Sequence, residues 1–326
     1  MGMKASANEY ANEYANEYAK ASANGGFAKD FTRIPKDIKS SQKINRASLT
    51  YSQGVIRTLR QNSFAMASLA FIAFMVLVAI AGPMLLPDYQ KQDLLHALEA
   101  QSGEHWFGTD ILGRDVLTRL VRGTRISLTI GFVAETINLA VGVIIGGISG
   151  YMGGKVDMFL MRVIDVVVSI PQMIIIILLL TVLKGSVGTL LIALCITGWT
   201  GLARLVRGQI LSLRENEYAM AAQVLGASKW RILKTHLIPN CVGPILVNYT
   251  MSVPGAIGAE AYLSYLGLGI SIPEASWGNL LQMGANQFPG SLWLFFAPAA
   301  VFALSMLAFN LLGDGLRDAL DPQMRR

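Results

Sequence analysis

Long uncharged segments alternate with charged ones along this chain, and the alternation predicts six membrane-crossing helices. A helix needs about 20 predominantly apolar residues to cross about 30 Å of hydrocarbon. Six stretches without a formal charge approach or exceed that length: 63–87, 136–154, 166–183, 185–203, 235–259 and 275–313. We expect the second span to begin near Ile126 and to contain Glu135, and the last to begin near Ser291. The expected fold class is all-α, a polytopic membrane protein with six transmembrane helices.

The composition supports a membrane protein and excludes other classes. Of 326 residues, 53% are hydrophobic and 15% are charged, whereas an average soluble protein has roughly 25% charged residues. Two cysteines, Cys195 and Cys241, are too few for a disulfide scaffold or a four-cysteine metal site. The net charge of +6 could indicate either nucleic-acid binding or a cytoplasmic excess of cations. The positions of the cations distinguish the two.

Most cations lie on one side of the predicted membrane. Six spans place both termini on the same side, where 21 of the 27 Lys and Arg residues then fall. Because segments rich in Lys and Arg remain in the cytoplasm, we expect a multi-pass membrane protein with cytoplasmic termini and no nucleic-acid partner. The expected domains are a cytoplasmic tail at 1–62, with low complexity at 1–26, and a transmembrane domain at 63–320 with outer loops at 88–125 and 260–291.

The cytoplasmic segment 214–240 has the pattern helix, glycine, helix. Good helix formers run from Glu215 to Leu225, and Gly226 suits the left-handed residue that ends such a helix. Ser228 can cap a second helix from Lys229 to about Leu237, which we expect Pro239 to end. Small side chains on the first helix allow close approach of another surface (Ala219, Ala221 and Ala222), and apolar anchors surround them (Tyr218, Leu225 and Trp230). A docked partner and an ordinary hairpin covering the bundle both remain possible on pattern alone.

This segment resembles the EAA loop of binding-protein-dependent ABC importer permeases. Ala221, Ala222, Gly226 and Pro239 fall on its pattern, while Met220 replaces its Glu. Further motifs resemble the peptide/nickel branch of that superfamily, in particular the C-type permease of oligopeptide importers. They are His105–Arg119, with the form His-x-Phe-Gly-Thr-Asp-x-x-Gly-Arg-Asp, and the segments Tyr262–Gly269, Ala275–Gly278 and Asn310–Pro322.

The resemblance implies the type I ABC importer permease fold, a location in the bacterial plasma membrane, and a set of partners. These are a second homologous permease in a heterodimer, two ABC ATPases that hold ATP and Mg, and an extracytoplasmic protein that delivers a peptide. No cofactor or enzyme activity is expected on this chain. The implied ATPase-coupling residues lie in one segment: Glu217, Tyr218, Ala221, Ala222, Leu225, Gly226, Ala227 and Pro239.

Charged residues inside or beside the spans are the other candidates for function, because such charges are costly in lipid. Arg162 and Asp165 are three residues apart and predict a salt bridge at the inner end of the third span. Glu135 lies deeper, without an obvious local partner. We expect water to reach Glu260 at the outer end of the fifth span, and Trp277 and Trp293 to lie at the lipid headgroups.

Other classes fit the sequence less well. A self-sufficient secondary transporter would need no coupling segment and would usually show an internal repeat, which is not visible. Gly147–Gly150 matches the Gly-x-Ser-Gly of intramembrane serine proteases, but the histidines (His96, His105 and His236) all lie in predicted loops. Within the importer class, dipeptides and nickel remain alternatives to oligopeptides.

Overall fold

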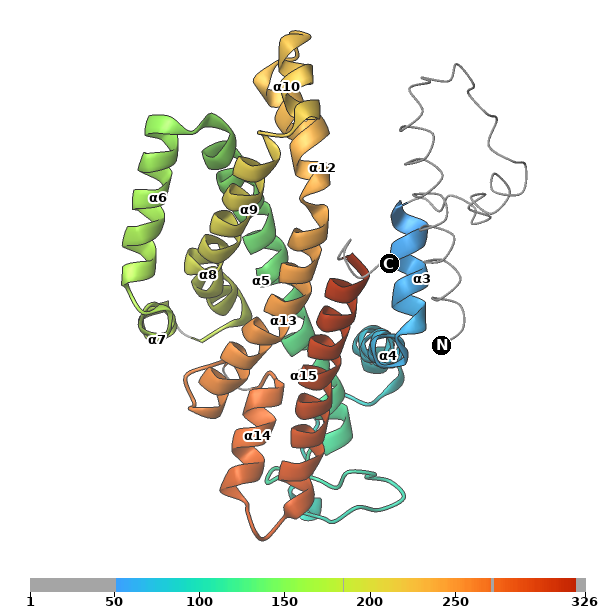
Figure 1. Cartoon of the computed structure of the whole chain (residues 1–326). Coiled ribbons are helices and arrows are strands. Elements are labelled where there is room, and N and C mark those ends of the chain that lie inside the picture. The colour runs from blue at the N-terminus through green and yellow to red at the C-terminus, as the bar shows by residue number, and fades with distance from the viewer. Residues whose placement is uncertain (1–50, 184, 271–272, 321–326) are drawn as a thin grey trace, which may run out of the picture. The chain divides into compact units, whose positions relative to one another are not determined.

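The computed structural model describes residues 51–183, 185–270 and 273–320, and these residues fold as helices, with a long loop at 86–115 and shorter connections elsewhere (Figure 1). The tail helix and the long helices are, in order, α3 (Tyr51–Gln61), α4 (Ser63–Leu85), α5 (Val116–Met152), α6 (Gly154–Ser169), α7 (Gln172–Leu183), α8 (Val187–Thr197), α9 (Trp199–Leu213), α13 (Val242–Tyr265), α14 (Trp277–Asn286) and α15 (Leu292–Leu320). The predicted low-complexity repeat, and all of the 1–62 tail before α3, lie outside the described residues.

The described helices account for the predicted spans with changed boundaries. Four are long and apolar enough to cross a membrane: α4, α5, the α8–α9 segment Val187–Leu213, and α15. The fifth predicted span corresponds to α13, which has 24 residues but is less apolar. The outer loops are shorter than expected, because 116–125 belongs to α5 and 260–265 belongs to α13.

The third predicted span, at 166–183, is not one continuous helix. The chain there forms two helices, α6 and α7, with a 70° bend between them. Pro171 stands at the break, where its ring and missing N–H prevent the helix from continuing and disfavour helical backbone at the preceding residue. The span is therefore a bent pair, and Figure 1 shows α7 nearly end-on below α6.

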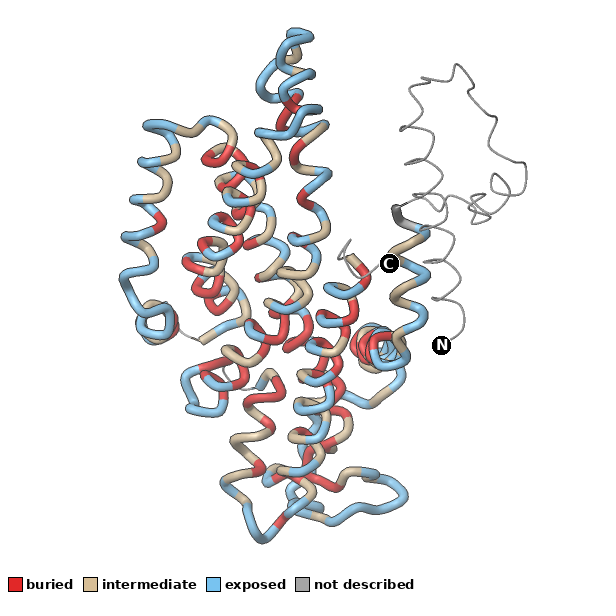
Figure 2. Tube along the Cα trace, in the orientation of Figure 1, coloured by how far each residue is buried: buried red, intermediate tan, exposed pale blue. Residues whose placement is uncertain are grey.

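Three clusters of buried apolar side chains hold the helices together (Figure 2). One joins α4, α5, α13, α14 and α15, and includes Ile72, Trp277 and Phe309. A second joins α5, α7, α8 and α13. The third joins α9 to the segment between α9 and α13, through residues such as Val206, Ile210, Leu233 and Leu237. That segment therefore packs on the bundle through its own apolar side.

Helices α5 and α9 pack at backbone distance. Gly142, Gly146 and Gly150 recur every four residues on α5, where small residues let helices approach closely. A Cβ on Gly150 would lie 2.8 Å from the carbonyl oxygen of Arg207, and one on Gly146 would meet the carbonyl oxygen of Ala203. This contact fixes α9, and with it the start of the next segment, against α5.

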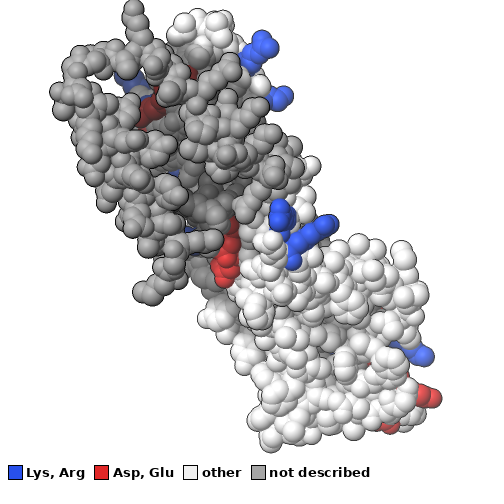
Figure 3. Space-filling view, turned by 45° about the vertical axis from the view of Figure 1, so that its right-hand side comes forward, with Lys and Arg blue, Asp and Glu red and all other residues white. Residues whose placement is uncertain are grey.

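The surface of the described part is uncharged over a wide area. Figure 3 shows this area between Lys and Arg side chains above it and a few charged side chains near the lower end. On α4 the exposed large side chains are apolar throughout, among them Phe74, Leu77 and Ile80. Such a face suits lipid, and it separates charged zones at the two ends of the spans.

Candidate coupling site

The segment between α9 and α13 begins with a short helix, α10 (Glu217–Val224), that ends in a glycine turn. Gly226 has φ +82°, the left-handed conformation that the sequence pattern predicts. Ala227 N–H donates to the carbonyl of Ala222, and Gly226 N–H donates to that of Gln223, both at 3.0 Å. These two bonds form a Schellman motif, which satisfies carbonyls at the helix end and reverses the chain. The predicted helix–glycine–helix geometry is confirmed.

The second part of the segment differs from the prediction at Pro239. Ser228 caps α11 (Lys229–Ile232), its Oγ accepting from Arg231 N–H at 3.3 Å. The helix then widens into a π-helical turn, η2 (Leu233–Leu237), and continues as α12 (Ile238–Asn240). Pro239 does not end the helix. It stands in the first turn of α12, where a missing N–H costs nothing, and the chain continues through Cys241 into α13.

One side of the segment is buried and the other is exposed. Ala219, Ile232 and Leu233 belong to the third core cluster, and Ala222 and Ala227 pack against it half-buried. The opposite side carries large exposed apolar side chains, which we call the apolar tip: Val224 (87% exposed), Leu225 (86%), Trp230 (63%), Met220 (49%) and Tyr218 (39%). The same segment also has exposed charged side chains of both signs: Glu215, Glu217, Lys229, Arg231 and Lys234. The segment thus presents large apolar side chains among charged ones.

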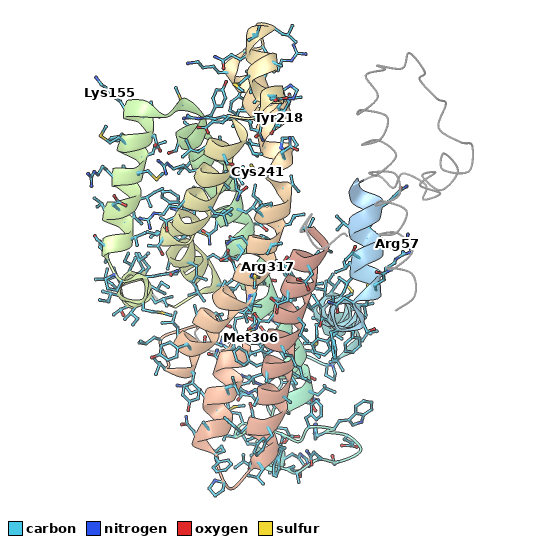
Figure 4. The ribbon with its side chains drawn as sticks, in the orientation of Figure 1. Arg57, Lys155, Tyr218, Cys241, Met306 and Arg317 are labelled. Carbon is cyan, nitrogen blue, oxygen red and sulfur yellow. The ribbon has the colours of Figure 1, made fainter. Side chains whose placement is uncertain are left out.

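The coupling residues predicted from the sequence differ in how far they are exposed. Glu217, Tyr218, Ala221, Leu225, Gly226 and Pro239 are exposed, and Ala222 and Ala227 are half-buried. The coupling residues predicted from the sequence do not include Met220 and Val224, which are both exposed in the apolar tip. The sequence does indicate both residues. They are four residues apart on one helix face, and Met220 occupies the place where the EAA pattern has Glu. Figure 1 shows α10 beyond the ends of the neighbouring helices, and Figure 4 labels Tyr218 there and Lys155 at the same end.

The predicted intramembrane charges all have partners. Glu135 accepts from Asn138 Nδ2 at 3.2 Å. Asp165 lies 3.8 Å from Arg162, as the spacing predicts, but it lies nearer to Arg204 of α9, at 2.9 Å. Asp157 is bound by Arg207, also on α9. The charged side chains of α6 therefore connect this helix to α9.

Glu260 and Trp277 are not where the sequence analysis expects them. Glu260 is fully buried, and its carboxylate accepts from Ser127 Oγ at 2.8 Å and from Ser264 Oγ at 2.7 Å. Trp277 is also fully buried and donates from Nε1 to Thr124 Oγ1 at 3.1 Å. The expected water-accessible Glu260 and headgroup-level Trp277 are therefore wrong. The folding of α14 back against α5 and α13 covers both side chains.

The outer motif at 105–119 builds a compact loop. Asp110 is fully buried and binds Arg114 at 2.7 Å, with Arg119 at 3.5 Å. His105 Nδ1 lies 2.8 Å from Asp115, the residue that caps α5. In the same loop, the hydrogen bond between Asp93 and His96 raises the pKa of His96 and lowers that of Asp93. The motif therefore stabilises the loop that precedes α5.

Comparisons with known proteins agree with this arrangement. Residues 142–326 match the family described as binding-protein-dependent transport system inner membrane component. Residues 50–100 match the N-terminal transmembrane domain of oligopeptide transport permease C.

Two relatives come from Bacillus subtilis. The dipeptide transport system permease protein DppC is 45% identical over 290 residues, covering 88% of this chain and 91% of the relative. The oligopeptide transport system permease protein OppC is 45% identical over 287 residues, covering 88% and 94%. OppC of Escherichia coli K12 is 40% identical and covers 87% and 95%.

A solved structure shares the fold. It is a chain of the MetNI methionine ABC transporter in an inward-facing conformation, with a TM-score of 0.52 and 16% sequence identity, covering 62% of this chain and 96% of that chain. The fold is therefore that of a type I ABC importer permease. Matches over most of its length show that the chain belongs to the inner membrane components of binding-protein-dependent transport systems, as a C-type permease of the oligopeptide and dipeptide group.

Proposed function

We propose that this chain is a transmembrane permease subunit of an ABC importer that takes up oligopeptides, and that ATPase subunits act on it through residues 215–239. The apolar tip is the single observation that carries this proposal. Val224 and Leu225 are more than four-fifths exposed at the end of a rigid, well-packed segment. Exposed apolar patches with a polar border mark protein interaction sites, and a helix end of this kind fits a groove in a partner.

The partners follow from the family. A second homologous permease would complete the pathway, two ABC ATPases would hold ATP and Mg, and an extracytoplasmic protein would deliver the peptide. The distribution of Lys and Arg supports a multi-pass protein of the bacterial plasma membrane with both termini in the cytoplasm. That orientation also places the apolar tip on the side where ATP is available. No cofactor is assigned to this chain.

The relatives support peptides as the substrate class. Permeases of dipeptide and of oligopeptide systems are equally similar to this chain, at 45% identity each. We favour oligopeptides because the N-terminal match is to the oligopeptide permease C domain. Nickel and a self-sufficient secondary transporter are not favoured by these relatives.

Co-purification tests the proposal. The tagged chain is isolated in mild detergent from cells that express the neighbouring transporter genes, and we expect stoichiometric ATPase subunits and a second permease. In proteoliposomes, the complex with its delivery protein should accumulate a labelled oligopeptide only when ATP is present on the tip side. Isolation of a lone chain that transports without ATP would contradict the proposal.

A further inference from the structure

A cluster of polar and charged side chains ties the base of the coupling segment to α6. Asp157, in the first turn of α6, accepts from Arg207 of α9, from Nε at 2.5 Å and from Nη2 at 2.6 Å. Ser149, near the end of α5, donates to the same carboxylate at 2.5 Å. Arg214, the last residue before the coupling segment turns outward, donates to the carbonyl of Gly150 at 3.2 Å. Helices α5, α6 and α9 therefore meet at Asp157.

Helix α6 has few other attachments. Among its 16 residues, Ile164 is the buried one, and large apolar side chains such as Phe159 are exposed. A second ion pair joins Asp165 to Arg204, but both side chains are about half exposed, whereas Asp157 is 16% exposed. Exposed pairs contribute little to binding two elements together. A forked, half-buried arginine–carboxylate contact is stronger and also fixes the relative angle of the two groups.

The other side of this contact is rigid. Val206 and Ile210, which flank Arg207 on α9, belong to the same core cluster as Ile232 and Leu233 of the coupling segment. A displacement of the coupling segment must therefore move α9. Helix α6 is joined to α5 through Gly153, and its direct polar contacts with α9 are the Asp157–Arg207 and Asp165–Arg204 pairs. It then leads into the 70° bend and α7.

We propose that Asp157 is a positioning residue for transport, which through Arg207 makes the bent α6–α7 span follow the coupling segment when an ATPase moves it. This inference rests on the proposed function. Rigid elements transmit movement between alternative arrangements through contacts of this kind, because packed interfaces shift between discrete states. Asp165 lies on the same helix and also pairs with an arginine of α9, so it provides the matched control.

The test uses the complete transporter in proteoliposomes, with Asp157→Asn and Asp165→Asn compared with wild type. Three quantities are measured: the amount of assembled complex, the rate of ATP hydrolysis, and the peptide transported per ATP. We expect Asp157→Asn to keep the complex and its hydrolysis while transport per ATP falls about tenfold. Asp165→Asn should change none of the three. The exchange Asp157→Arg with Arg207→Asp should recover part of the loss.

Two results would overturn the inference. Asp157→Asn could behave like Asp165→Asn, or complex, hydrolysis and uptake could all fall in parallel, as expected of a residue that only stabilises the fold. If the wild-type chain binds no ATPase, the proposed function fails first and the inference fails with it, so the two failures are distinguishable.

A second variant, Arg207→Lys, keeps the inference testable if Asp157→Asn folds poorly. Arg207→Lys keeps the positive charge but cannot form the fork. Spin labels on Lys155→Cys in α6 and Gly208→Cys in α9, in a background without Cys195 and Cys241, report the distance between the two helices. Both positions are exposed, and a side chain on Gly208 meets no atom within 4 Å. We expect one distance with and without ATP when Arg207 is present, and a nucleotide-dependent change with Arg207→Lys. Equal behaviour of the two chains would overturn the inference.

Discussion

Shortening Leu225 to alanine is the most direct test of the apolar tip. The side chain is 86% exposed in the isolated chain, so docking of a partner can bury nearly all of it. Leu225→Ala removes three carbon atoms, each worth about 0.8 kcal/mol when buried, which gives about 2 kcal/mol of lost binding free energy. That loss corresponds to about thirtyfold in the dissociation constant of the ATPase subunits.

The stability of the permease itself should hardly change. An exposed side chain makes few contacts within the chain, and such substitutions usually alter the free energy of unfolding by less than about 0.5 kcal/mol. Ile232→Ala, in the same segment but 2% exposed, should show the opposite pattern. It leaves the tip side chains in place but costs about 2–5 kcal/mol of folding free energy through a cavity. Leu77→Ala, on the lipid-facing side of α4, should affect neither quantity.

The assay is a titration of purified ATPase subunits onto the permease in nanodiscs, with thermal unfolding of each variant measured in parallel. Weaker binding with unchanged thermal stability for Leu225→Ala supports the reasoning. Wild-type affinity for Leu225→Ala would refute it, because a side chain so exposed cannot be buried by a partner and contribute nothing. The same loss for Leu77→Ala would show that apolar content, and not the tip, is what matters.

Three further predictions follow from particular contacts. Gly226→Asp should lower ATP-driven uptake about a hundredfold, because an unpaired carboxylate in an interface costs several kcal/mol. Asparagine adopts the same left-handed backbone without the charge, so Gly226→Asn should retain most uptake. Equal loss in both variants would show that the backbone, and not the charge, is responsible. Glu260→Ala should destabilise the permease by about 2–4 kcal/mol, because it leaves a cavity and buried serine hydroxyls without an acceptor. The loss should appear as a lower Tm in detergent, and Glu260→Gln should lower the Tm less. An unchanged Tm for Glu260→Ala would contradict this. The pKa of His96, raised by its hydrogen bond to Asp93, should fall toward its ordinary value in Asp93→Asn when followed by NMR of labelled histidine. Because His96 has a raised pKa and Asp93 a lowered one, their contribution to stability is lost as pH rises through the pKa of His96 or falls through that of Asp93. An unchanged pKa of His96 in Asp93→Asn would contradict the pairing.

Local patterns in the sequence predicted the features that depend on neighbouring residues. Uncharged runs located the spans because lipid excludes charge over a whole helix length. Gly226 and Ser228 located the turn and the cap of the coupling segment, since both requirements are set within one turn of helix. The bend at Pro171 was also visible in principle, because proline interrupts a helix wherever it stands in the interior.

Local sequence patterns could not predict contacts between segments that are distant in the sequence. Arg162 was the sequence-neighbour partner of Asp165, yet Arg204, 39 residues away, lies nearer to it. Asp157 and Arg207 are 50 residues apart, and Ser127 and Glu260 are 133 apart. Pairs of this kind exist only because the fold brings α6 against α9 and α5 against α13. Pro239 was misjudged for a related reason, since the widened turn before it depends on packing into the third core cluster.

The buried carboxylate of Glu260 and the half-buried one of Asp157 indicate how an apolar bundle keeps specific helix contacts. Lipid offers no hydrophobic driving force between helices, so close packing and polar bonds must select the partner face. Here small residues admit close approach, as Gly150 does for Arg207, and a carboxylate then binds donors from more than one helix. Glu260 does this with Ser127 and Ser264, and Asp157 does it near the start of the coupling segment. Both sites include a serine of α5, Ser127 in one and Ser149 in the other, so α5 is the helix that links a movement at one site to a movement at the other.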